Sequence, residues 1–440
     1  MVPSGHDLVL AGGTAVLAQG PRAADIGVAG GAIAEIGPPG SLRGERTLSV
    51  SGMVVMPGGI DPHVHLQQLT ASGQTSSDGF RSGSEAALWG GTTTLGDFAY
   101  PLPGQRLLDS WKERREAMTA GCRCRCFLHQ AFGDEVPDLE AQIDEVMAAG
   151  ARSFKLHMND PRVDAGFVER VCRLLAPRGA LLMVHAEMGA GIRANVARLR
   201  RRGELGVASL PRCQPAALEA EAIDLLLSRV SRFGTRVYIV HLTSERGLDV
   251  IRSYRRRGVA VEAETCPQYL LLTEEVYARP GGHRYTCTPP FRTDRDREAL
   301  WGALAGGEVQ TVATDHCPFW AAQKDAGEGD FTRLPMGLPG VENRVPLFVT
   351  AARERGFGWE LIARLLSTNA AGIFALPGRE GIAPGAPADL VVYRPDGVSR
   401  LQPAELHMRC DFSPYAGMEL RGEVETTMLS GRLWPGDFVG

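Results

Sequence analysis

The run IDPHVHL at residues 60–66 carries two histidines near its end. It decides the fold because it is the first of eight short apolar runs, and seven more follow it along the chain. Each is a short apolar stretch of the kind that forms a buried strand. They are GTTTLGDFA (91–99), RCFLHQAF (125–132), SFKLHM (153–158), ALLMVHAE (180–187), RVYIVHLTS (236–244), VAVEAETCP (259–267) and VQTVATDHCP (309–318). Segments with apolar residues at helical spacing, such as ALEAEAIDLLLSRVSRFG, lie between them. Strands that alternate with helices in this way predict a (β/α)8 TIM-like barrel, class α/β, over residues 53–377.

Both ends of the chain have a different pattern, in which short strand-like runs are separated by glycine and proline turns. DLVLAGGTAVL and TLSVSGMVVMPG lie near the amino terminus, and ADLVVYRPD and VETTMLSGRLWPG lie near the carboxyl terminus. Chain ends commonly meet beside a central domain. We therefore expect one small β-sandwich domain formed by residues 1–52 and 378–440.

The composition indicates a globular protein that is neither strongly basic nor built to cross a membrane. Apolar residues make up 44% of the chain, and 47 Lys and Arg against 51 Asp and Glu leave a net charge of −4. This balance gives no reason to expect a nucleic acid or an anionic membrane as partner. No apolar run has the roughly 18 residues of a membrane span. The start, MVPSGHDLVLAGG, lacks the features of a secretory signal, so we expect a cytoplasmic protein with its nine cysteines reduced.

Groups that can bind metal stand at or near the ends of the predicted strands, where barrels of this kind place their active sites. They are His63, His65, Lys155, His185, His241 and Asp315. A single histidine at a strand end is usually only a hydrogen-bonded histidine. Four histidines with an aspartate, each on a separate strand end or paired as H-x-H, indicate a site. Residues i and i+2 of a strand point the same way, so His63 and His65 can chelate one ion. Imidazole and carboxylate suit Zn²⁺ and similar ions.

Lys155 needs a separate interpretation, because an ammonium group cannot bind a metal ion. It could be a surface charge, but SFKLHM reads as a barrel strand, where an unpaired lysine is costly. A deprotonated amine can react with CO2 to form a carbamate. That anionic group could bridge two ions.

The chain resembles the amidohydrolase superfamily, and within it the dihydropyrimidinases and hydantoinases, with allantoinase and dihydroorotase as more distant relatives. The resemblance extends over nearly the whole chain in the right order. Its motifs are PGGIDPHVHLQ (57–67), DGFRSGSEAALWGGTTTLGDFA (78–99), SFKLHM, VHAE, VHLTS, ETCPQYLLLT (264–273), CTPPFR (287–292), ATDHCPF (313–319), GLPGVENRVPL (337–347), STNAAGIFAL (367–376) and GIAPGAPADLVVYRPD (381–396).

The resemblance implies a site with two divalent metal ions. By position, His63, His65 and Asp315 would hold the more buried ion, and His185 and His241 would hold the other. A carbamate on Lys155 would bridge them, and zinc would be the expected metal. Asp315 would act first as base and then as acid in the hydrolysis of a cyclic amide or imide to an N-carbamoyl or related acid.

Two details favour the hydantoinase and dihydropyrimidinase branch. Dihydroorotases that resemble this chain carry Arg two residues after the second histidine, and this chain has Gln67 there. The stretch CTPPFR resembles one whose backbone binds the substrate ring in hydantoinases, which maps that contact onto Thr288. A second backbone contact maps onto Pro339, which can offer a carbonyl but no N–H.

One departure affects the expected substrate contacts. Hydantoinases have a tyrosine five residues after the metal-binding lysine, where its hydroxyl supports the developing oxyanion. This chain has Asp160 there, and an anion beside a forming oxyanion would hinder the reaction. His157 could donate instead, although a packing role for His157 is an equal alternative.

Three functions therefore remain open. The first is ring opening of a cyclic amide or imide. The second is an allantoinase-like or dihydroorotase-like reaction on another ureide, or a ring closure. The third is a non-catalytic homologue, which the six intact ligand positions argue against. The resemblance also implies a homodimer or homotetramer, and loop 66–79 should line the substrate site.

Overall fold

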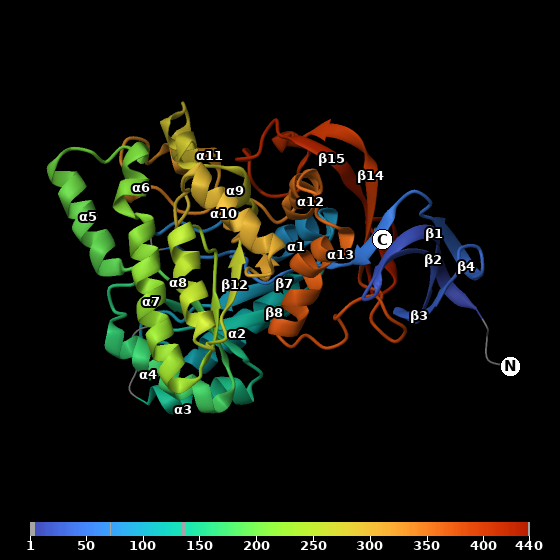
Figure 1. The fold of residues 1–440 in the computed structure, drawn as a ribbon, viewed down its shortest axis with the longest axis horizontal. Coiled ribbons are helices and arrows are strands. Elements are labelled where there is room, and N and C mark those ends of the chain that lie inside the picture. Colours follow the sequence, from blue (N-terminus) through green and yellow to red (C-terminus); the bar gives the residue numbers. More distant parts are fainter. Residues whose placement is uncertain (1–4, 71, 134–137, 439–440) are drawn as a thin grey trace.

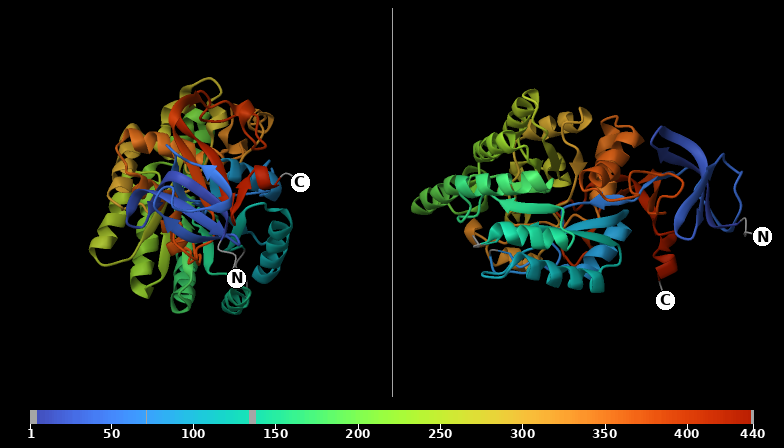
Figure 2. Two further views of the ribbon diagram at one scale, coloured as in Figure 1. Left: turned by 90° about the vertical axis from the view of Figure 1, so that its right-hand side faces the viewer. Right: turned by 90° about the horizontal axis from the view of Figure 1, so that it is seen from below.

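The computed structural model describes residues 5–70, 72–133 and 138–438, which form two sheets with their helices (Figure 1, Figure 2). Residues 1–4, which open the segment that was considered as an export signal, lie outside this range. So does residue 71 of the predicted substrate loop.

The first sheet is a parallel barrel whose strands follow one another in chain order. Its members are β6 (Gly59–Asp61), β7 (Thr92–Ala99), β8 (Arg125–Ala131), β9 (Ser153–His157), β10 (Leu181–His185), β11 (Arg236–Ile239), β12 (Glu262–Thr265) and β13 (Thr311–Val312). A parallel bridge between Val64 and His316, just beyond the first and last strands, closes the ring. The predicted barrel is confirmed.

Helices surround this barrel. The longer ones are α1 (Phe80–Trp89), α2 (Leu107–Gly121), α3 (Leu139–Ala148), α4 (Ala165–Leu175), α5 (Gly189–Arg201), α7 (Ala216–Phe233), α8 (Glu245–Arg256), α10 (Asp294–Ala305) and α12 (Arg344–Glu354). The shorter ones are α6 (Leu210–Cys213), α9 (Pro267–Leu271), α11 (Ala321–Asp325), α13 (Trp359–Ala363) and α14 (Asn369–Ile373).

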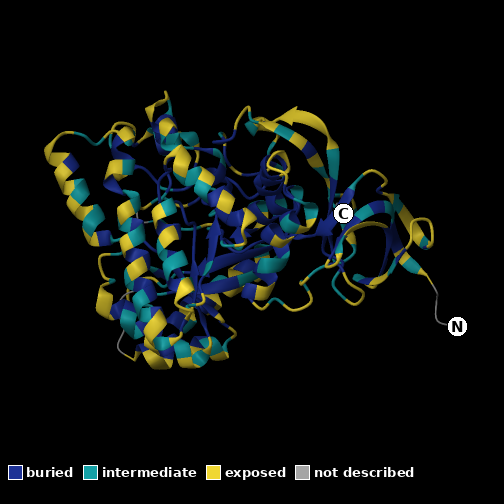
Figure 3. Cartoon of the chain, in the orientation of Figure 1, coloured by how far each residue is buried: buried dark blue, intermediate teal, exposed yellow. Residues whose placement is uncertain are grey.

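Helix α7 shows why these segments are helical and which face they bury. Its buried residues include Ile223, Leu226, Leu227 and Val230, which recur at the three- and four-residue spacing of one helix face. The helix ends at Gly234, whose φ of 73° is a left-handed value that glycine adopts without strain. Figure 3 shows the resulting pattern, with buried residues inside and exposed residues on the outer helix faces.

Strand β10 has all five residues buried because both of its faces are covered. Leu182 and Val184 belong to the large core cluster that includes the surrounding helices. Leu181 and Met183 belong to a smaller cluster with Phe98, Tyr238 and Phe374. The barrel interior is therefore packed with side chains and is not a channel.

The second sheet joins the two ends of the chain. It contains β1 (His6–Leu17), β2 (Gly20–Ala29), β3 (Ala32–Gly37), β4 (Gly44–Ser49), β5 (Val54–Pro57), β14 (Leu390–Arg400), β15 (Glu419–Leu429) and β16 (Arg432–Trp434). The antiparallel pairing of β14 with β5 connects the carboxyl-terminal to the amino-terminal strands. Figure 1 places this sheet at one end of the molecule, beside the barrel. The predicted fold class, a barrel with a β domain built from both termini, is confirmed.

Two expectations from composition can be compared with the structure. All nine cysteines are free thiols. Among the described residues, no helix combines the length and the apolar character needed to cross a bilayer.

Candidate active site

A cavity of about 720 Å³ lies at the carboxyl end of the barrel strands. All six predicted metal ligands line it, and so do Thr288, His157 and Asp160. Gln68, Leu69, Thr70 and Ser72 of the loop after the second histidine also line it. Pro339 is buried and is not among the lining residues.

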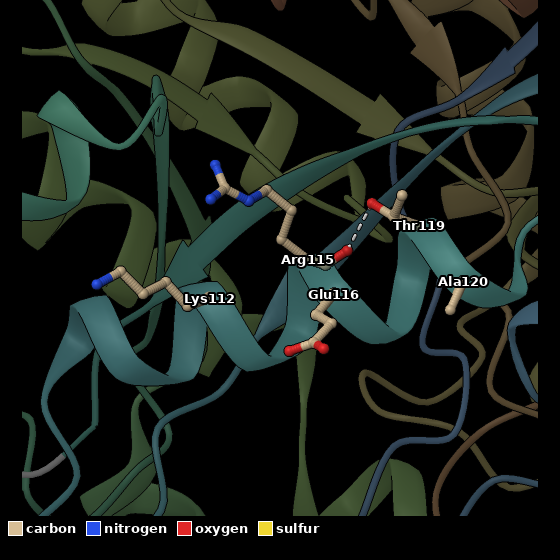
Figure 4. Close-up of a pocket in the computed structure, with 5 residues that line it drawn as sticks. All are labelled: Lys112, Arg115, Glu116, Thr119 and Ala120. Atoms are coloured by element: carbon tan, nitrogen blue, oxygen red, sulfur yellow. Dashed lines mark hydrogen bonds between the residues drawn. The ribbon is translucent and has the colours of Figure 1, made fainter.

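A second hollow on the surface has none of these features (Figure 4). It lies along α2 and is lined by Lys112, Arg115, Glu116, Thr119 and Ala120, all of which are exposed. Within it, the Thr119 hydroxyl donates to the Arg115 carbonyl at 2.8 Å. Solvated side chains of a single helix provide no enclosed chemistry, so the barrel cavity is the candidate site.

Three ligand atoms gather at the bottom of the cavity. Asp315 Oδ1 lies 3.0 Å from His65 Nε2 and 3.3 Å from His63 Nε2. Ligand atoms of these three residues all lie within 4.8 Å of one another, as a metal site requires. Lys155 Nζ lies 3.2 Å from His63 Nε2 and is therefore beside the group.

A second pair of nitrogens faces the same cavity from the neighbouring strands. His185 Nδ1, at the end of β10, lies 3.0 Å from His241 Nε2, just beyond β11. Both side chains are only 3% exposed. The sequence placed these residues on separate strands, and the barrel brings them together.

Buried carboxylates fix the orientation of two of these imidazoles. Glu264 Oε1 contacts His63 Nδ1, and Glu187 Oε2 lies 2.9 Å from His185 Nε2. Each contact occupies one ring nitrogen and leaves the other free to face the cavity, as in many metal sites. Neither glutamate was predicted from the sequence. The signal was present, because Glu187 lies two residues after His185 and Glu264 lies within a predicted strand.

The backbone is strained at two of the ligand positions. His241 has a φ of 39° and Asp315 has a φ of 54°, left-handed values that are uncommon for residues other than glycine. His241 lies two residues beyond the end of β11, and Asp315 lies three residues beyond the end of β13. Strain of this kind is tolerated where the surrounding structure fixes it, and it is concentrated at functional sites.

Burial sets the protonation of the cluster. It lowers the pKa of His63 and of His241 well below the usual value, which favours the neutral imidazole that binds metal. It lowers the pKa of Lys155 to about 8. Burial raises the pKa of Asp315, but the nearby His63, His65 and Lys155 outweigh this and bring the pKa to about 2. The site therefore combines neutral imidazoles at His63 and His241 with an ionised carboxylate at Asp315.

Asp160, which lines the cavity, has its carboxylate paired with a neighbouring guanidinium. It lies in the turn after β9, and its carboxylate accepts hydrogen bonds from the Arg162 guanidinium at 2.6 and 2.9 Å. The Arg162 backbone N–H donates to the same carboxylate at 2.9 Å. The expected conflict between an aspartate and a forming oxyanion is therefore reduced by this ion pair.

The fold and this cluster of histidines, lysine and aspartate at the carboxyl end of the strands define a barrel enzyme with a candidate metal centre. The chain belongs to the amidohydrolase family, whose pattern matches residues 54–434. The resemblance expected from the sequence motifs is thereby confirmed.

Individual relatives cover almost the whole chain. The D-hydantoinase of Streptomyces coelicolor is 35% identical over 438 residues, which are 96% of this chain and 93% of that protein. The structure of a D-hydantoinase (dihydropyrimidinase) from Thermus sp. matches with a TM-score of 0.93 at 30% identity, covering 97% of this chain and 94% of that one. The structure of the L-hydantoinase (dihydropyrimidinase) from Arthrobacter aurescens matches with a TM-score of 0.89 at 26% identity, covering 97% and 96%.

Proposed function

We propose that this amidohydrolase opens cyclic amide rings of the hydantoin and dihydropyrimidine type, giving an N-carbamoyl acid. The observation that carries the proposal is the convergence of the six predicted ligands on one buried cavity. Relatives named D-hydantoinase, which align over nearly the whole chain, support the same reaction.

The donor set fits two divalent ions. His63, His65 and Asp315 would hold one, while His185 and His241 would hold the other, with zinc favoured by the nitrogen and oxygen ligands. When bound, two such ions acidify a water molecule and polarise a substrate carbonyl. Glu264 and Glu187 would keep the liganding nitrogens of His63 and His185 directed at the cavity.

Lys155 would join the two halves of this centre as a carbamate. Its amine is 1% exposed and lies beside His63 with no carboxylate in hydrogen-bond contact. Burial lowers the pKa of this amine to about 8, so the neutral form that attacks CO2 is accessible near neutral pH. The nitrogen forms a bond to the carbon of CO2 and loses one proton, which gives a bidentate anionic ligand.

Asp315 is the group placed to move the proton. Its carboxylate lies at the cluster, held by His65 and His63, and a pKa of about 2 keeps it ionised and able to accept. It would take a proton from the attacking water and deliver it to the amide nitrogen as the ring C–N bond breaks. One residue then serves as base and as acid.

The cavity wall also fits a ring with an apolar substituent. Ile192, Val196, Leu210, Leu334 and Met336 line the cavity together with the polar metal-facing residues. A polar floor and an apolar side wall suit a cyclic ureide whose substituent packs against the wall. Thr288 lies on the cavity as well, near Glu187, where its backbone could bind the ring.

The first experiment combines metal analysis with a panel of ring compounds. We expect about two metal ions per chain, and ring opening of dihydrouracil and of 5-substituted hydantoins. Allantoin and dihydroorotate, with N-carbamoyl acids for ring closure, form the second arm. Turnover confined to the second arm would replace our proposal with an allantoinase-like or dihydroorotase-like function. Absence of metal and turnover would indicate a non-catalytic homologue.

The carbamate is tested separately. Native mass spectrometry should show one added CO2, and Lys155→Ala should lose metal and regain it with a short carboxylate such as acetate or propionate. A normal metal content in Lys155→Ala would refute the bridging role. The proposed homodimer or homotetramer is tested by light scattering, and a monomeric mass would contradict it.

A further inference from the structure

Hydrolysis of an amide places negative charge on the carbonyl oxygen as water adds to the carbon. A hydrogen-bond donor aimed at that oxygen is among the strongest contributions that a protein can make. Asp160 cannot donate when ionised, and its carboxylate is bound to Arg162. A buried donor elsewhere on the cavity wall could make this contact.

Tyr100 carries such a donor. It follows directly after β7, at the carboxyl end of that strand, and it lines the cavity. Its ring centre lies 6.1 Å from that of His65, 5.9 Å from that of Phe98 and 5.7 Å from that of His157. The phenol therefore lies against the face of one predicted ligand, among packed rings that restrict its movement.

The hydroxyl of Tyr100 lies 3.4 Å from His157 Nε2. A contact of this length is a weak hydrogen bond, so the hydroxyl lies near His157 and can still bind a second partner. A phenol is protonated at neutral pH, so this hydroxyl can donate a hydrogen bond.

His157 is placed to hold that hydroxyl. It ends β9, pairs in register with His185 of β10, and lies two residues beyond Lys155. Its ring stacks on that of His185 with centres 5.8 Å apart and planes 28° apart. When Nε2 of this ring carries the proton, it donates to the Tyr100 oxygen and leaves the phenol proton free.

Given the proposed ring-opening function, we propose that Tyr100 is a catalytic residue whose hydroxyl donates a hydrogen bond to the carbonyl oxygen as it becomes an oxyanion. His157 is the positioning residue that holds the phenol in place. No bond to Tyr100 forms or breaks, because the phenol donates a hydrogen bond and retains its proton. The chemistry needs no further reactant.

The test is Tyr100→Phe, which removes one oxygen and keeps the ring packing. We expect kcat to fall about 100-fold or more, the usual cost of one lost oxyanion donor, with KM within about 3-fold and metal content unchanged. The matched control is Tyr254→Phe. That hydroxyl contacts Asp224 on the outer helices, so the control should keep wild-type kcat.

A binding measurement separates an oxyanion contact from simple packing. A cyclic phosphinate that reproduces the tetrahedral carbon should lose affinity for Tyr100→Phe by the same factor as kcat/KM, measured by calorimetry. Unchanged kcat, or a loss of kcat with unchanged phosphinate affinity, would overturn the role of Tyr100. If the unsubstituted enzyme opens none of the ring compounds, the proposed function itself fails, and the role of Tyr100 fails with it.

His157 is tested by two substitutions. His157→Gln keeps an N–H donor near the Nε2 position and should retain most of kcat, while His157→Leu should lower kcat about 10-fold with little change in KM. Equal kcat for both variants would show that His157 does not position Tyr100. Normal metal content in both variants is required, because His157 lies beside His185.

Discussion

The two ends of the barrel are built from opposite kinds of residues. At the amino end, Ala370, Ala371 and Ile373 of α14, followed by Phe374, fill the barrel against Tyr238 and its neighbours. Arg236, the first residue of β11, donates to the Ile373 carbonyl at 3.1 Å and so links α14 to the barrel. At the carboxyl end, imidazoles, a lysine and carboxylates surround a cavity, and two of these residues have strained backbones.

The two ends of the barrel therefore differ in role: the amino end contributes to stability, and the carboxyl end carries the candidate chemistry. Apolar groups at the amino end gain free energy by burial, at about 25 cal/mol per Å² of apolar surface. Ionisable groups at the carboxyl end lose solvation, a cost that the proposed roles in metal binding and proton transfer would explain. Substitutions at the two ends should therefore affect different measurements.

The largest expected effect is at the carboxyl end. Asp315→Asn should lower kcat by about 10⁴-fold, because the proton-transfer group is removed. The melting temperature should change little, since asparagine tolerates the left-handed φ of 54° at this position. The control is Asp249→Asn on the exposed face of α8, which should leave kcat unchanged. A kcat for Asp315→Asn within 10-fold of wild type would contradict the assignment.

The reverse result is expected at the amino end. Phe374→Ala should lower the free energy of unfolding by about 3–5 kcal/mol, through lost burial and a cavity, as measured by urea denaturation. Folded Phe374→Ala protein should keep its kcat. Val398→Ala, at a side chain that is 64% exposed, should change stability by less than about 0.5 kcal/mol. If Phe374→Ala abolished kcat in folded protein, the separation of the two ends would be wrong.

A smaller effect is expected from the carboxylates behind the ligands. Glu264→Gln should weaken metal affinity by about 10–100-fold, because it alters the group that orients His63. Excess metal should restore most of the activity. Glu262→Gln is the matched control on the same strand, since Glu262 interacts with Arg236 at the amino end. Metal titration of the two variants decides the point, and equal affinities would exclude the orienting role.

The smallest effect tests whether the contrast extends to exposed charges. Hydrogen bonds from the Arg284 guanidinium and from His283 lower the pKa of Asp325 to about 2, near the carboxyl end. Arg252 lowers the pKa of Glu308, which precedes β13 at the amino end. A lowered carboxyl pKa in the folded state stabilises the protein above the unfolded pKa, and this contribution is lost as the pH falls.

Asp325→Asn and Glu308→Gln should therefore each cost less than about 1 kcal/mol near pH 6, because exposed ion pairs are screened by solvent. The difference from wild type should shrink as the pH falls below about 4, in urea denaturation at a series of pH values. Similar behaviour at both ends would limit the contrast to buried groups. A cost that grows as the pH falls would contradict the sign of both pKa shifts.

Much of the site could be predicted from sequence because its ligands lie at strand ends. His63, His65, Lys155, His185, His241 and Asp315 are separated by long stretches of chain, yet parallel strands bring their carboxyl ends to one edge. The β-sheet formed by both termini was predictable for a similar reason, since its turn-rich runs differ from the alternating pattern of the barrel.

Residues that act through contacts between distant segments could not be predicted. Tyr100 follows an ordinary apolar strand, and its sequence does not indicate that its hydroxyl lies near His157. Met336 lies outside the helices and lines the cavity, although its local sequence does not mark it as a cavity residue. The ion pair between Asp160 and Arg162 is likewise seen only in the folded structure.

The sequence by itself determined the barrel, the terminal β domain and the residue types of the metal-binding cluster, because strand periodicity and strand-end position are local properties of the chain. Only the tertiary structure decided which carboxylates contact His63 and His185, and that the Tyr100 hydroxyl lies near His157 in the cavity. These features depend on distances between side chains from different strands, and those distances are fixed by the closure and packing of the whole barrel.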